Sequence, residues 1–171
     1  DLIVDNLSKI KSNVNSIIVS KSQNENIKFW KYREAIPPSE TNEKICIQHD
    51  ISLPLENMNG FIKEAINEVK KISPNVKIIN FGHLGDNNLH FNILSSETTN
   101  YNKLIKNKDK ITGIIYSKTY KYHGSFSAEH GIGQLKRKEL KKYKPEEEIE
   151  QMLKIKRNFD PKNILNPGKI F

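Results

Sequence analysis

Two short apolar runs on either side of a polar loop constrain the fold of this chain more than any other feature. Val76 to Phe81 and Leu89 to Leu94 have the length and composition of β-strands, and a seven-residue loop, Gly82-His-Leu-Gly-Asp-Asn-Asn88, joins them. A connection this short is typical of antiparallel neighbours, so the segment predicts a β-hairpin. Asn87 or Asn88 tolerates the left-handed conformation that such a turn needs, and we expect the loop to form.

The other predicted elements are helices and strands without a regular β-α-β alternation. Strands are expected at residues 15–20 and 44–53, and helical spacing is found at 2–10, 23–36, 55–72 and 101–122. Residues 126–133 indicate a glycine-rich strand or loop, and a helix is expected on each side of Pro145. Helices grouped against a few strands predict an α+β fold in a single domain, residues 1–171. Because the chain opens inside a helical pattern, we expect it to be a piece of a longer protein.

The formal charge of +8 is carried by 25 Lys and only 3 Arg. A nucleic-acid-binding protein is expected to favour Arg, whose planar guanidinium binds phosphates and bases bidentately, so we expect no nucleic-acid partner. The densest basic run, residues 136–144, is most simply a solvated helix face, with a peripheral membrane contact as the alternative. Neither a membrane-spanning apolar run nor a signal peptide is found, which favours a cytoplasmic protein and leaves open a location peripheral to the inner membrane.

Histidines and a carboxylate are the candidate metal ligands. Cys46 is the single cysteine, which excludes an intrachain disulfide and a cysteine-based zinc site. His83 and His90 flank the polar loop, and a turn between them can bring both imidazoles to one point, with Glu129 as a third ligand. Two His and one carboxylate form catalytic zinc sites and open iron sites. The alternative is that each His is a hydrogen-bonded loop residue without a metal.

Two further segments carry candidate catalytic and binding residues. Glu129 and His130 are neighbours, so an extended backbone directs their side chains apart. Glu129 can then hold a metal while His130 faces a reacting group as general base, the other interpretation being a glycine-rich turn with a surface Glu-His pair. Arg33 lies three residues after the single Trp and either binds a carboxylate with its planar fork or pairs with Glu34 on its helix.

Three segments of the chain match one known pattern. They are residues 81–92 (FGHLGDNNLHFN), 125–136 (SFSAEHGIGQLK) and 152–169 (MLKIKRNFDPKNILNPGK). Together they resemble the C-terminal domain of FAD-linked oxidases, the family of D-lactate dehydrogenase, D-2-hydroxyglutarate dehydrogenase and the FAD subunit of glycolate oxidase. The resemblance implies a ferredoxin-like antiparallel sheet with helices, the cap domain of vanillyl-alcohol-oxidase-type flavoproteins. It also implies that the FAD-binding domain lies upstream and is absent from this chain.

The resemblance assigns roles to particular residues. It implies that His83, His90 and Glu129 bind a divalent metal, zinc or manganese. It also implies that His130, the neighbour of the metal-binding glutamate, is the catalytic base.

Three further residues have implied binding roles. Arg33 and Asn92 would bind the substrate, with Arg33 on its carboxylate, and Asn166 would approach the flavin. The implied reaction is the FAD-dependent oxidation of a 2-hydroxyacid of the D-lactate, glycolate or D-2-hydroxyglutarate class, with hydride passing from the α-carbon to the flavin. The full-length enzyme would pass electrons to a quinone, a cytochrome or an electron-transfer flavoprotein, and a homodimer is left open.

The chain departs from the family pattern at one position that bears on the substrate. Gln48 stands where the family commonly has Lys, so a cation on the substrate side is missing and a dicarboxylate substrate is less expected. The alternative function is therefore a split or decayed metal-binding module without catalytic activity. The chain also contains no dinucleotide glycine motif and no P-loop, so we expect the isolated chain to bind metal but to be inactive and to hold no FAD tightly.

Overall fold

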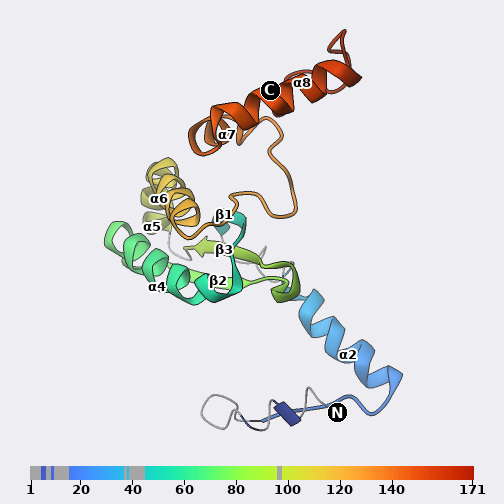
Figure 1. Cartoon of the computed structure of the whole chain (residues 1–171). Helices are drawn as coiled ribbons and strands as arrows, with labels where there is room; N and C mark the ends of the chain where they lie inside the picture. Colours follow the sequence, from blue (N-terminus) through green and yellow to red (C-terminus); the bar gives the residue numbers. More distant parts are fainter. Residues whose placement is uncertain (1–4, 7–8, 10–15, 37, 39–44, 96–97) are drawn as a thin grey trace. The chain divides into compact units, whose positions relative to one another are not determined.

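The computed structural model describes residues 5–6, 9, 16–36, 38, 45–95 and 98–171 (Figure 1). The chain divides into two compact units, Asp1–Asn42 and Glu43–Phe171, and each is described by itself. Among its described residues, the second unit has three strands, five α-helices and one 3-10 turn. The predicted α+β class is therefore confirmed.

The first unit contains helix α2, Gln23–Glu34, where the sequence predicts a helix at 23–36. Ser22 caps it, because its hydroxyl accepts the N–H of Glu25 at 3.2 Å. The strand predicted at 15–20 is wrong: residues 16–20 have no regular secondary structure, and residue 15 lies outside the described residues. Ile18 and Val19 are exposed there, and no described strand pairs with them, so a β-branched run alone does not make a strand. The helix predicted at 2–10 lies mostly outside the described residues.

The second unit is built on an antiparallel sheet. Its strands are β1 Ile45–Ser52, β2 Lys77–Phe81 and β3 Asn88–Leu94, in the order β1-β3-β2. The predicted hairpin is confirmed, because β2 and β3 pair antiparallel and a 3-10 turn, Leu84–Asp86, lies between them. Asn87 follows this turn with φ 57°, the left-handed conformation expected at that position.

The two faces of this sheet differ in chemistry. His49 of β1 lies opposite Phe91 of β3, and both side chains are buried on the same face of the sheet. The intervening positions point to the other face, where Asp50 lies opposite His90 and Gln48 lies opposite Asn92. The second face therefore carries Gln48, Asp50, His90 and Asn92, whereas His49 is the polar residue of β1 on the first face.

Three helices, α4 Leu55–Ile72, α5 Thr98–Lys106 and α6 Lys108–Lys121, pack against the apolar face (Figure 1). The helical structure predicted at 101–122 is confirmed except that it is not one helix, because α5 and α6 meet at Asn107. The Asn107 side chain donates to the Lys103 carbonyl at 3.0 Å, and this local hydrogen bond competes with continuation of the helix. The helix predicted at 55–72 is confirmed.

The chain after α6 returns to the sheet before its last two helices. Ser125 forms an antiparallel bridge with Ser52 at the end of β1, through N–H to carbonyl hydrogen bonds of 2.9 Å in both directions. The helices expected on each side of Pro145 are confirmed as α7 Arg137–Tyr143 and α8 Glu146–Phe159. Among the residues that the structure describes, no helix combines the length and apolar character needed to cross a membrane.

Candidate metal and proton-transfer site

The β2–β3 hairpin positions two histidines at the polar face of the sheet. His83 lies just before the 3-10 turn, and its carbonyl accepts the N–H groups of Asp86 and Asn88 at 3.0 and 3.1 Å. Gly82 is required at the start of the loop, because a Cβ there would lie 2.3 Å from the Asn88 carbonyl oxygen. His90 follows in β3 and stacks on Phe81 with ring centroids 4.8 Å apart.

The segment after α6 brings a third group to the same place. Gly124 allows this segment to cross β1 closely, because a Cβ there would lie 2.3 Å from the Ser52 carbonyl oxygen. The bridge at Ser125 follows, and the N–H groups of Glu129 and His130 both donate to Asp50 Oδ2 at 3.0 Å. The loop that carries Glu129 is thereby attached to β1 at two places, at Ser52 through the bridge and at Asp50 through these hydrogen bonds.

Glu129 contacts both predicted histidine ligands. Its Oε1 lies 2.9 Å from His83 Nδ1, and its Oε2 lies 3.5 Å from His90 Nε2. The structure therefore brings His83, His90 and Glu129 together although 46 positions separate the first from the last. Two imidazoles and one carboxylate are the ligand set that zinc and manganese accept, so the residues present fit a divalent metal.

His130, the neighbour of Glu129, contacts Asp50, and its role as a base stays a prediction. Its Nδ1 lies 2.8 Å from Asp50 Oδ2, and its side chain is 70% exposed. The His130 ring centroid lies 6.4 Å from that of His90, so an exposed imidazole stands next to the histidine ligands.

Asp50 is the site residue that sequence reasoning missed. Ligand atoms of Asp50, His90 and Glu129 all lie within 4.8 Å of one another, so these three residues form a group that can hold a metal ion, and His83 is not part of it. Asp50 is only 9% exposed, and no local signal in the sequence singles it out. Burial raises the pKa of Asp50, but the N–H groups of Glu129 and His130 outweigh that effect, so its pKa lies below the ordinary value.

The remaining predicted site residues lie at different places. Asn92 is 3% exposed on β3, two residues after His90 and on the same face of the sheet. Arg33 lies on α2 in the first unit, so its place at the site stays a prediction. Asn166 lies in the C-terminal segment with φ 46° and lines a hollow with Arg157 and Lys169. Its predicted approach to a flavin stays a prediction as well.

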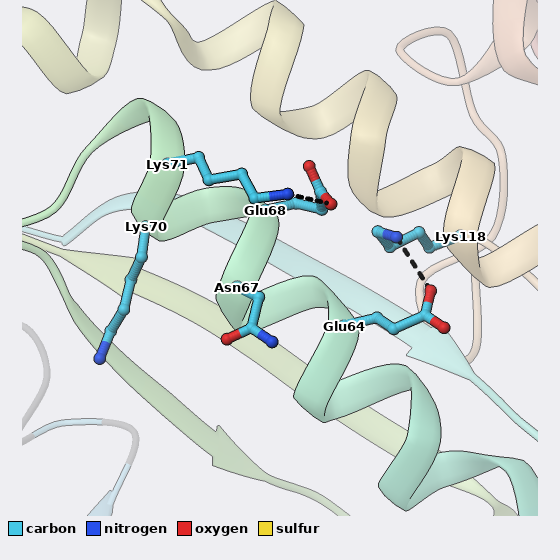
Figure 2. Close-up of a pocket in the computed structure, with 6 residues that line it drawn as sticks. All are labelled: Glu64, Asn67, Glu68, Lys70, Lys71 and Lys118. Carbon is cyan, nitrogen blue, oxygen red and sulfur yellow. Dashed lines mark hydrogen bonds and ion pairs between the residues drawn. The ribbon is translucent and has the colours of Figure 1, made fainter.

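A second hollow lies on the helix layer (Figure 2). It is lined by polar and charged side chains of α4 and α6: Glu64, Asn67, Glu68, Lys70, Lys71 and Lys118. Figure 2 shows the ion pairs of Lys118 with Glu64 and of Lys71 with Glu68. The nitrogen and oxygen atoms of each pair are 3.0 Å apart. Because α4 and α6 cover the apolar face of the sheet, this ion-pair network is separated from Glu129 by the sheet itself.

Comparison with known proteins defines the class. The chain belongs to the family of FAD-linked oxidases and matches the model of their C-terminal domain over residues 7–170. Similar proteins are named D-2-hydroxyglutarate dehydrogenase. The protein of that name from Stutzerimonas stutzeri is 37% identical over 155 residues, which cover 90% of this chain and 33% of the relative.

Eukaryotic relatives give the same result. The mitochondrial D-2-hydroxyglutarate dehydrogenase of Arabidopsis thaliana is 35% identical over 94% of this chain and 27% of its own length. The zebrafish (Danio rerio) enzyme is 36% identical over 82% of this chain and 25% of its own length. The chain thus spans about a quarter to a third of the length of these curated relatives.

Proposed function

We propose that this chain is the substrate- and metal-binding part of an FAD-dependent 2-hydroxyacid dehydrogenase. The observation that supports this most is the arrangement of two consecutive residues. The Glu129 carboxylate meets His83 and His90, whereas His130 presents an exposed imidazole beside them. Family membership and the names of the relatives support the same class of reaction.

In this proposal His83, His90 and Glu129 hold a zinc or manganese ion. When bound, the ion supplies a positive charge that orients and polarises the hydroxyl and carboxylate oxygens of the substrate. Asp50 is the weaker candidate ligand, because its Oδ2 already accepts hydrogen bonds from two N–H groups and lies against His130 Nδ1. Its Oδ1 accepts the side-chain amide of Asn88 at 3.0 Å.

Each protein side chain then has a separate role in the oxidation. His130 takes the hydroxyl proton of the substrate on Nε2, while the α-carbon loses its hydrogen with the bonding electron pair and becomes the carbonyl carbon of a 2-oxoacid. A bound flavin would supply the acceptor for that hydrogen and electron pair. Arg33 binds the substrate carboxylate, Asn92 donates to the substrate from the buried side, and Asn166 approaches the flavin.

The finer architecture belongs to the same proposal. The order β1-α4-β2-β3-α5-α6, with strands in the order β1-β3-β2, matches a ferredoxin-like β-α-β-β-α-β unit up to its last strand. The Ser52–Ser125 bridge lies beside β1, where that last strand would pair, and supports this assignment. We further propose a single C-terminal cap domain that works with an FAD-binding domain, in a protein whose cytoplasmic location and electron acceptor remain predictions.

Metal analysis and turnover test the proposal together. The complete protein is purified with FAD, its zinc and manganese are measured, and D-lactate, glycolate and D-2-hydroxyglutarate are supplied with an artificial electron acceptor. Glu129→Gln is expected to lose the metal and turnover, and His130→Ala to keep the metal and lose about 10²–10⁴-fold in kcat. His123→Asn is the matched control, because His123 is an exposed histidine with φ 58°, which Asn tolerates.

The outcomes separate the two candidate functions. Stoichiometric metal without oxidation of any hydroxyacid would favour the metal-binding module without catalytic activity. Near-normal turnover of the His130 variant would remove the assigned base. A wild-type protein without metal, prepared without chelators, would remove the assigned ligand set.

Gln48 gives a test of substrate class. It lies opposite Asn92 on the polar face of the sheet and is exposed. A substrate with a second carboxylate would gain a charge-assisted hydrogen bond from Lys at this position, about 1.5–3 kcal/mol, or roughly 10–100-fold in affinity. We therefore expect Gln48→Lys to raise kcat/KM for D-2-hydroxyglutarate relative to D-lactate. An unchanged ratio would place Gln48 outside the substrate pocket.

A further inference from the structure

We infer that Asp50 is the positioning residue that holds His130 in the tautomer and orientation of a general base. The inference rests on the proposed function for the role of His130, but the geometry of Asp50 stands by itself. Asp50 belongs to β1, whereas His130 belongs to the loop after α6, 80 positions further along the chain. A side chain from one element thus controls the catalytic group of another.

Both oxygens of the Asp50 carboxylate accept hydrogen bonds from neighbouring groups. Oδ2 accepts the N–H groups of Glu129 and His130, both at 3.0 Å, and lies 2.8 Å from His130 Nδ1. Oδ1 accepts the Asn88 amide at 3.0 Å. Every partner fixes either the loop that carries the base or the strand that carries His90.

These contacts determine which ring nitrogen of His130 carries the proton. A carboxylate oxygen only accepts hydrogen bonds, so the ring nitrogen facing it at 2.8 Å must be the donor. In the neutral tautomer that this contact selects, Nδ1 of His130 carries the proton and Nε2 carries the lone pair. Since the His130 side chain is 70% exposed, Nε2 is the nitrogen available to a substrate.

The same contacts separate Asp50 from the metal ligands. A ligand oxygen must direct a lone pair at the ion, but Oδ2 already meets three donors. The Glu129 oxygens, in contrast, meet the two imidazoles that are the proposed co-ligands, one oxygen to each. The Asp50 side chain therefore orients the ligand-bearing loop and leaves coordination to His83, His90 and Glu129.

The first measurement reads the tautomer directly. The complete, FAD-containing protein is labelled with ¹⁵N-histidine and loaded with zinc, and long-range ¹H–¹⁵N correlations identify the protonated nitrogen of His130, assigned by its loss in His130→Ala. We expect Nδ1–H in the wild type and in Asp50→Asn, whose amide oxygen can take the place of Oδ2. A wild-type His130 protonated on Nε2 would overturn the inference whether or not the protein oxidises hydroxyacids.

The second measurement is a double-mutant cycle on kcat. Asp50→Ala is expected to lose about 10²–10⁴-fold, as His130→Ala does, and the double variant to lose no more than His130→Ala alone. Asp50→Asn should recover part of kcat, and the zinc content and KM of these variants should stay close to wild type. Ser127→Ala is the control for general loosening of the loop, because Ser127 Oγ bonds the Gly131 carbonyl at 2.6 Å without contacting Asp50.

Each alternative result identifies another role for Asp50. Additive losses in the double variant would show that Asp50 does not act through His130, and loss of zinc in Asp50→Asn would show that it is a ligand. If Asp50→Ala does not fold, Asp50→Asn and the wild-type tautomer still decide the question. A wild type without hydroxyacid oxidation but with Nδ1–H on His130 would reject the proposed function and retain the geometry.

Discussion

Replacement of the buried His49 is expected to flatten the dependence of stability on pH. His49 is 2% exposed, with Nδ1 3.0 Å from the Phe91 carbonyl oxygen and Nε2 3.2 Å from Thr112 Oγ1. Burial lowers the pKa of His49 from 6.5 to about 4; the Phe91 hydrogen bond opposes this, and the charges of Lys136 and Lys108 reinforce it. The native protein therefore keeps this ring neutral at pH values where the unfolded chain protonates it.

The size of the effect follows from that pKa difference. Because the unfolded chain binds the extra proton, the free energy of unfolding rises with pH between about 4 and 6.5 and is lost as pH falls through that range. The difference of 6.5 minus about 4 corresponds to about 3 kcal/mol in full. Between pH 8 and pH 5 the loss is about 2 kcal/mol.

Urea denaturation followed by circular dichroism measures this loss. Unfolding is carried out at pH 8 and pH 5 in EDTA, so that no metal contributes, for the wild type and for His49→Gln, whose side chain stays neutral. We expect the wild type to lose about 2 kcal/mol more than His49→Gln between the two pH values. Ile51→Val, on the same buried face of β1, is the control and should cost about 1 kcal/mol at both. Equal pH dependence in the wild type and His49→Gln would refute the argument.

Three other perturbations test the fold. In thermal unfolding, Gly113→Ala should stabilise by about 0.5–1 kcal/mol, because α6 leaves open space for the new Cβ. Gly124→Ala should destabilise by at least about 2 kcal/mol, because its Cβ would lie 2.3 Å from the Ser52 carbonyl oxygen; a neutral result would contradict the close crossing at that point. Hydrogen bonds from Tyr122, Lys118 and Lys121 lower the pKa of Glu64 from 4.5 to about 2. The extra stability of the wild type over Glu64→Gln should therefore be fully present above pH 4.5 and disappear as pH falls to about 2. NMR should give a titration midpoint near 2 for the Glu64 carboxyl group.

The hairpin was predictable because its signals are local. Alternating apolar residues, a short polar loop and an Asn suited to positive φ all lie within residues 76–94, and the structure has the expected turn with Asn87 at φ 57°. The strand expected at residues 15–20 failed for the opposite reason. A strand depends on a partner for its backbone groups, and a β-branched run carries no information about whether that partner exists.

The site was predictable only in part. The spacing of His83 and His90 and the adjacency of Glu129 and His130 indicated which side chains could converge. Nothing local indicated Asp50, because its partners lie 79 and 80 positions away and the bridge at Ser52 and Ser125 sets the register. The break between α5 and α6 likewise depends on one side-chain hydrogen bond of Asn107 that competes with a good helical pattern.

The attachment of the Glu129 loop to β1 has a consequence for the order in which the chain folds. The site combines three segments that are distant in sequence, the middle of β1, the β2–β3 hairpin and the loop after α6, so it exists only once their long-range pairings have formed. Under the proposed function, metal uptake should therefore be among the last events of folding. The kinetics of zinc incorporation during refolding would report the completion of the fold itself.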